Sequence, residues 1–218
     1  MDPVKDPAST SARHMRQRLK GRYSASLTKG SLKVGEMRVV AELVDSGKSS
    51  SEVIEAILDS NLLQKRSPES SITFGRYLLK RLGLCPKSLV TLIAHGTNRE
   101  ATQGAFIATL LESALMRDFL EHAVTGIKGV GRTFLTNSDW TSFLEWLESQ
   151  EPEVIRWTVS GRSKLRQNVL RVLAEAEILD STKSMTFQSV RLEPSIRQCL
   201  LDPTLQSVLP ALIAGGME

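Results

Sequence analysis

The chain has 218 residues, of which 41% are hydrophobic and 24% charged, and its formal net charge is +4. This composition is typical of a globular protein with one large or two small domains, and it excludes a low-complexity chain. The longest uncharged runs, residues 101–111 and 203–217, are too short or too interrupted by Pro and Gly for a membrane span, which takes about 20 apolar residues. Because the two cysteines, Cys85 and Cys199, have no motif spacing, we expect a reducing, cytoplasmic location.

The basic residues are unevenly distributed along the chain. Residues 13–22, 64–81 and 154–174 hold 15 of the 28 Lys and Arg residues and only 1 of the 24 acids. Such clustering is typical of proteins that bind polyanions, although a solvated helix face is the plain alternative for any one cluster. The polar residues 1–22 are predicted to form a mobile basic N-terminal arm.

Residues 23–96 are predicted to form an N-terminal helical subdomain. Apolar residues recur at helical spacing from Met37 to the stop at Gly47, and Ser49 to Ser51 supply an N-cap for a second helix. Ser67 and Pro68 then begin a third helix. Two helices joined by a tight turn and followed by a basic helix form a helix-turn-helix-like (HTH-like) element. Its candidate DNA contacts are Lys65, Arg66, Arg76, Lys80 and Arg81.

Residues 97–136 are predicted to form a long central helix, capped by Asn98, followed by the glycine-rich loop "TGIKGVGRTFLT". The loop lacks the G-K-[ST] ending of a phosphate-binding loop and follows a helix rather than a strand, so a nucleotide pocket is not expected. No two histidines have metal-ligand spacing, and the carboxylates form no nuclease-like group. We therefore expect no metal, no cofactor and no enzymatic activity.

Residues 137–218 are predicted to form a C-terminal subdomain of the winged HTH type. A helix begins at Asn137 or Ser138, a short helix covers 153–158, and Ser160 caps the stretch "SGRSKLRQNVLRVLAEAEILDS". Weak alternation then predicts a short β-wing at residues 183–193. In this order of elements the second helix of the motif enters the major groove of DNA.

The helix that Ser160 caps has two different faces. Its apolar residues, such as Leu165 and Val169, fall on one side at helical spacing and are predicted to face the core. The opposite side carries cations suited to phosphates and amides suited to base edges. The candidate DNA contacts on this helix are Arg162, Ser163, Lys164, Arg166, Gln167, Asn168 and Arg171. The predicted fold class is thus all-α, mainly helical, with HTH elements.

Three stretches resemble the BrxA family of bacteriophage-exclusion (BREX) defence systems: "YSASLTKGSL" at 23–32, "NLLQKRS" at 61–67, and residues 157–179. The resemblance implies a small, helical, cytoplasmic and non-catalytic protein that acts with a DNA methyltransferase and other BREX components, and for which double-stranded DNA is the natural ligand. The chain departs from the family pattern at Glu177, which stands where glycine is frequent. This acid stands at the turn into the predicted wing.

The sequence leaves three hypotheses for function. The leading one is sequence-tolerant binding of double-stranded DNA, mainly through phosphate contacts from the basic helices. The first alternative is an assembly adaptor whose basic faces dock acidic surfaces of other defence proteins. The second is RNA binding by a helical bundle, although an aromatic content of 5% counts against stacking of single strands. The chain is expected to be a monomer or a weak oligomer.

Overall fold

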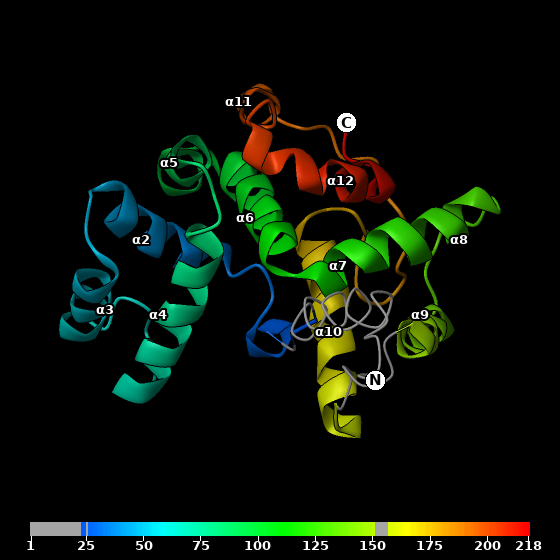
Figure 1. Cartoon of the computed structure of the whole chain (residues 1–218), viewed down its shortest axis with the longest axis horizontal. Coiled ribbons are helices and arrows are strands. Elements are labelled where there is room, and N and C mark those ends of the chain that lie inside the picture. Colours follow the sequence, from blue (N-terminus) through cyan, green and yellow to red (C-terminus); the bar gives the residue numbers. More distant parts are fainter. Residues whose placement is uncertain (1–22, 25, 151–156) are drawn as a thin grey trace, which may run out of the picture.

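The fold is seen in a computed structural model that describes residues 23–24, 26–150 and 157–218 (Figure 1). The predicted arm and most of the predicted short helix at 153–158 lie outside these residues. The elements are η1 (Ser26–Lys29), α2 (Val34–Asp45), α3 (Ser50–Asp59), α4 (Pro68–Leu82), α5 (Lys87–His95), α6 (Asn98–Glu112), α7 (Ala114–Asp118), η2 (Phe119–Val124), α8 (Thr125–Gly129), α9 (Asn137–Gln150), α10 (Val159–Glu175), α11 (Pro194–Cys199), η3 (Pro203–Val208) and α12 (Leu209–Gly215). The described elements are all helices, which confirms the all-α class.

Two of the predicted helix starts are confirmed in atomic detail. The Ser49 side chain accepts the amide of Glu52, and the Glu52 carboxylate accepts the amide of Ser49, which is a complete capping box at the start of α3. At the start of α4, the Ser67 side chain accepts the amide of Ser70, and Pro68 occupies the first helical position.

Two other starts differ from the prediction by one or two residues. A capping box closes the start of α6 at Thr97 rather than at Asn98. The helix α10 is capped by Thr158, whose hydroxyl accepts the amide of Gly161 at 3.1 Å, rather than by Ser160. In both places a threonine stands one or two residues before the predicted cap, and it takes the cap because β-branching favours its extended backbone.

The predicted long central helix is interrupted. The chain is extended at Ser113, with φ −111° and ψ 97°, and then continues through α7, the π-helical η2 and α8. The guanidinium of Arg117 donates to the carbonyls of Leu110 and Leu111, which satisfies the carbonyl end of α6. Because α8 is helical, the first part of the predicted glycine-rich loop is a helix, and this part of the prediction is wrong.

Two glycines allow helices to pack at close range. A Cβ on Gly75 of α4 would lie 2.8 Å from Cδ1 of Ile54 in α3, and one on Gly104 of α6 would lie 2.6 Å from Cγ1 of Ile93 in α5. A Cβ at either position would force the neighbouring isoleucine to shift, so each glycine allows its helix to pack closely against the next one.

The predicted wing forms isolated β-bridges rather than strands within the described ranges. Phe134 bridges to Thr186 and Leu179 bridges to Phe187, both in antiparallel orientation. The wing therefore lies between the segment that precedes α9 and the segment that follows α10. Sequence periodicity had shown only the wing itself, because the partner segments are too short to have a pattern.

The described residues share one connected apolar core that reaches from Tyr23 to Met217. Within this core, η1 contacts both α4 and α10, so it joins a helix of the N-terminal half to one of the C-terminal half. The division of the chain into an arm and three further parts stays a prediction. Within the described ranges, no helix combines the length and the apolar character needed to cross a membrane.

Candidate nucleic-acid interface

The helix α10 has the two faces that its sequence predicts. Leu165, Val169 and Val172 on its inner face are fully buried. On its outer face the side chains of Ser163, Lys164, Gln167 and Arg171 are exposed, and that of Arg166 is half-buried on the flank.

These five outer side chains, called here the α10 face, lack partners. None of them makes a hydrogen bond or an ion pair with another residue in the part of the chain that the structure describes. The single acid of α10, Glu175, is engaged elsewhere, since its carboxylate accepts the Ser31 hydroxyl at 2.8 Å and the Leu32 amide at 2.9 Å. The α10 face thus combines positive charge with free hydrogen-bonding groups.

Arg162, predicted as a DNA contact, is committed within the protein. Its guanidinium forms an ion pair with Glu148 of α9 and donates to the carbonyl of Trp157 at 3.2 Å. The side chain is 35% exposed, so it ties the end of α9 to the start of α10 and adds little free charge.

Asn168 was expected on the outer face, and the structure corrects this placement. The residue is 7% exposed, and its Nδ2 donates to the carbonyl of Leu27 in η1 at 2.6 Å. On a helix surface the neighbours of Asn168 are the exposed Lys164 and Arg171 on one side and the buried Leu165 and Val172 on the other, so Asn168 lies at the edge of the α10 face. The bond therefore places η1 directly beside the α10 face.

Arg81 was also expected to face outwards, and this placement is wrong. Its side chain is fully buried, donates to the carbonyl of Ser31 at 3.1 Å and to the hydroxyl of Tyr77, and lies 4.4 Å from the Tyr77 ring centroid. Burial lowers the pKa of Arg81 and raises the pKa of Tyr77 to about 12. Arg81 thus ties α4 to the segment that follows η1 and, being buried, cannot reach a ligand.

Of the other predicted DNA contacts before and on α4, two form ion pairs with acidic residues of the described chain and two do not. Lys65 pairs with Glu36 at 3.1 Å and lies over the ring of Phe74, while Lys80 is exposed but pairs with Glu112 at 2.8 Å. The side chains of Arg66 and Arg76 are exposed and make no ion pair with any residue of the described ranges.

The segment η1 brings the two predicted basic sites together, as Figure 1 shows, where the dark-blue turn lies between α4 and α10. It carries Lys29, an exposed cation that sequence reasoning missed. A single lysine in a short 3₁₀ turn has no pattern that would single it out. The basic residues of α4 and α10 are therefore linked by a third positive group.

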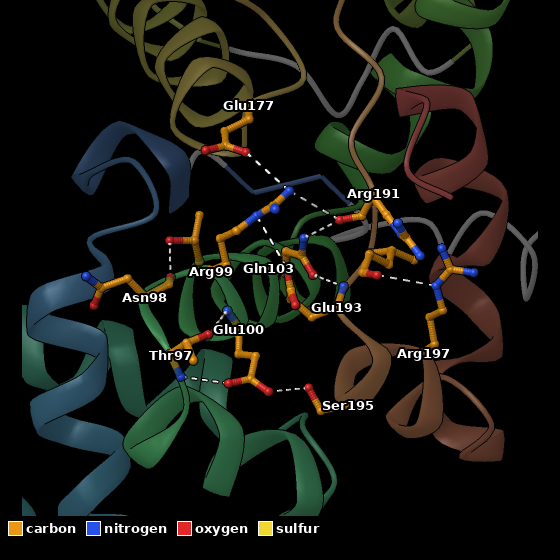
Figure 2. A network of polar contacts seen from close by, with 12 residues as sticks. Thr97, Asn98, Arg99, Glu100, Gln103, Glu177, Arg191, Glu193, Ser195 and Arg197 are labelled. Atoms are coloured by element: carbon orange, nitrogen blue, oxygen red, sulfur yellow. Dashed lines mark hydrogen bonds and ion pairs between the residues drawn. The ribbon is translucent and has the colours of Figure 1, made fainter.

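Glu177, where the chain departs from the family pattern, lies in the turn after α10. This residue has φ +61°, in the left-handed region that glycine adopts without strain. In Figure 2 its carboxylate points to Arg99 of α6, with an Oε2–Nη2 distance of 3.9 Å, and Arg99 also lies 3.4 Å from Glu193. An exposed ion pair thus accompanies a backbone conformation that favours glycine.

Gln103 anchors the end of the wing on α6 (Figure 2). Its side-chain nitrogen donates to the carbonyl of Arg191 at 3.0 Å, and its oxygen accepts the amide of Glu193 at 2.9 Å. The buried amide satisfies the backbone of this segment as a neighbouring strand would. The wing is therefore fixed to the same helix that packs against α4 and α5.

No three His, Cys, Asp or Glu side chains gather in a metal-binding arrangement in the ranges 23–24, 26–150 and 157–218.

The fold and the site together define a class: a helical protein that presents an unpaired basic helix face beside a small β-bridged wing. A family model described as BrxA matches residues 21–203. The chain belongs to the BrxA family of BREX phage-defence proteins.

Similar proteins cover most of the chain. "BREX protein BrxA" of Escherichia coli O9:H4 (strain HS) is 30% identical over 193 residues, which are 88% of this chain and 90% of the relative. "BREX protein BrxA" of Paramagnetospirillum magneticum is 29% identical over 188 residues, 86% of this chain and 94% of the relative. The crystal structure of an uncharacterized protein from Magnetospirillum magneticum superposes with a TM-score of 0.79 at 29% identity, covering 88% of this chain and 98% of that one.

Proposed function

We propose that this BrxA-family protein is a non-catalytic component of a BREX system that binds double-stranded DNA in the cytoplasm. It would act beside other BREX proteins, such as the methyltransferase. The observation that carries the proposal is the α10 face, whose three cations lack partners among the described residues. Free Lys and Arg side chains on a helix are the groups that phosphates attract most strongly.

The surroundings of α10 support an approach to the major groove. A bridged segment at Phe134 precedes α9, α10 follows α9, and the bridged residues Leu179 and Phe187 come next. This succession is similar to that of a winged HTH, in which the second helix of the motif enters the groove. Lys164 and Arg171 then face the phosphates, and Gln167 between them is able to pair with a base edge.

The test is a fluorescence-anisotropy titration of a labelled random-sequence duplex at several salt concentrations. Lys164→Ala/Arg171→Ala is compared with the control Lys48→Ala/Lys87→Ala, whose residues are also exposed. Lys48 lies between α2 and α3 and Lys87 begins α5, and Figure 1 shows these helices apart from α10. Each variant removes two positive charges. The α10 variant should bind at least about 10-fold more weakly. The plot of log K against log salt concentration should become less steep by nearly 2, because each lost phosphate contact removes about 0.9 from the steepness of the slope.

Other outcomes select the alternatives. Wild-type binding by a folded Lys164→Ala/Arg171→Ala variant would contradict the site. If the wild-type protein does not bind DNA but co-purifies with a BREX protein, and the Lys164→Ala/Arg171→Ala variant does not, the protein is an assembly adaptor. If a structured RNA displaces the duplex at equal concentration, RNA is the ligand.

A further inference from the structure

A hollow of about 530 Å³ lies between η1 and α4 and has a basic lining. Lys29 comes from η1, while Arg76 and Lys80 come from α4. The lining is completed by Ser24, Ser26 and Tyr77. Sequence reasoning placed Arg76 and Lys80 on one helix surface, but it did not reveal a concave site or the contribution of η1.

The charges of this hollow are not balanced. The carboxylate of Glu112 lies 2.8 Å from Nζ of Lys80 and accepts the hydroxyl of Ser26 at 2.8 Å. Lys29 and Arg76 make no ion pair with any residue in the described parts of the chain, although Nζ of Lys29 lies 5.8 Å from the centroid of the Tyr77 ring. Two positive charges therefore remain free, and each is available to an anion.

The hollow adjoins the α10 face. The bond from Asn168 to the carbonyl of Leu27 holds η1 against α10 at the edge of this face, and Lys29 follows Leu27 by two residues. A second link from α10 to the chain after η1 is the Glu175 carboxylate, which accepts the Leu32 amide. The positive surface of α10 thus continues through η1 to α4.

We infer that the hollow holds a backbone phosphate of the duplex that the α10 face contacts, with Lys29 and Arg76 as its charged partners. This inference rests on the proposed function, because α10 must hold the duplex for the phosphate to arrive. Separated phosphate contacts of this kind set the position of a protein on DNA without reading its sequence. One duplex per chain is therefore bound by both halves of the molecule.

The experiment compares Lys29→Ala/Arg76→Ala with Lys48→Ala/Lys87→Ala, using a labelled duplex of about 20 base pairs at several salt concentrations. Both variants remove two exposed positive charges, and thermal melting verifies that both are folded. The hollow variant should bind about 10-fold more weakly, and its plot of log K against log salt concentration should be less steep by nearly 2. A loss no larger than that of the control would overturn the inference.

The Lys164→Ala/Arg171→Ala variant separates this inference from the proposed function. If that variant binds weakly while the hollow variant behaves like the control, only the hollow fails. If that variant binds like the wild type, the proposed function fails and this inference falls with it.

Two further measurements test what the hollow holds. Stoichiometric titration should give one duplex per chain, whereas two duplexes for the wild type and one for Lys29→Ala/Arg76→Ala would mean that the sites act separately. Calorimetry with inorganic pyrophosphate should detect no tight binding. Tight pyrophosphate binding that the hollow variant lacks would overturn the inference and identify a free polyphosphate as the ligand.

Discussion

Two adjacent residues of α10, Gln167 and Asn168, have opposite surroundings although their side chains have the same chemistry. Gln167 is exposed and has no partner in the described chain, whereas Asn168 is buried against η1. Adjacent helix positions differ by about 100° around the axis, so one amide is available to DNA and the other to the protein.

Asn168→Ala should therefore destabilise the fold, because the carbonyl of Leu27 loses its buried donor. The expected cost is about 1–3 kcal/mol in the free energy of unfolding, measured by urea denaturation. Gln167→Ala is the matched control and should stay within about 0.5 kcal/mol of the wild type. Equal stability of the two variants would contradict the assignment.

Glu177→Gly should stabilise the protein, because glycine adopts the observed φ of +61° without strain. The gain should be up to about 1 kcal/mol, since the Arg99 pair that is lost is exposed and its atoms are 3.9 Å apart. Thermal melting provides the measurement. Glu177→Ala keeps the strain and loses the pair, so a gain in this control would disprove the explanation.

At the scale of elements, the start of α9 depends on one carboxylate. Asp139 accepts the amide and the hydroxyl of Thr136 at 2.6 and 2.8 Å, and it pairs with Arg132 at 2.5 Å. Burial raises the pKa of Asp139, but the hydrogen bonds from Arg132 and Thr136 outweigh it, so the net pKa is below the ordinary value. The ionised form is thus favoured by the fold and stabilises it.

Asp139→Asn should cost about 1 kcal/mol at neutral pH. Since the folded pKa is lower than the unfolded one, the unfolded chain binds the proton first as the pH falls. The stabilisation is complete above the unfolded pKa of about 4 and is lost as the pH falls through the folded value. Urea denaturation across this range should show the wild type and the variant converging at low pH. A constant difference would refute the argument.

At the scale of the whole molecule, Gln103 couples the wing to the N-terminal helices through two backbone hydrogen bonds. These two bonds join residues about 90 positions apart in the chain. The end of the wing therefore depends on α6 for its position.

Gln103→Leu keeps the volume of the side chain and removes both bonds. It should leave the amide of Glu193 and the carbonyl of Arg191 without partners, at a cost of about 1–3 kcal/mol for each buried group. Hydrogen exchange should show faster exchange of the Glu193 amide. Gln167→Leu, at an exposed position, should leave that amide protected. Unchanged exchange in Gln103→Leu would show that the wing is held by other contacts.

Local hydrogen bonding and spacing were enough to predict much of this protein from its sequence. The all-α class, the starts of α3 at Ser49 and of α4 at Ser67, and the burial of Leu165 and Val169 all depend on residues within a few positions of one another. The exposed cations Lys164 and Arg171 could be predicted from the same periodicity.

Only the tertiary structure decided which of the predicted cations and amides are free. Asn168 is buried because η1, more than a hundred positions away, packs against it. Arg81 is buried against Ser31, which follows η1 and is fifty positions away. A short 3₁₀ turn has no periodic signal, so neither its position nor the hollow that Lys29 completes could be read from the chain. Burial at such sites depends on contacts between distant segments, which local sequence patterns do not contain.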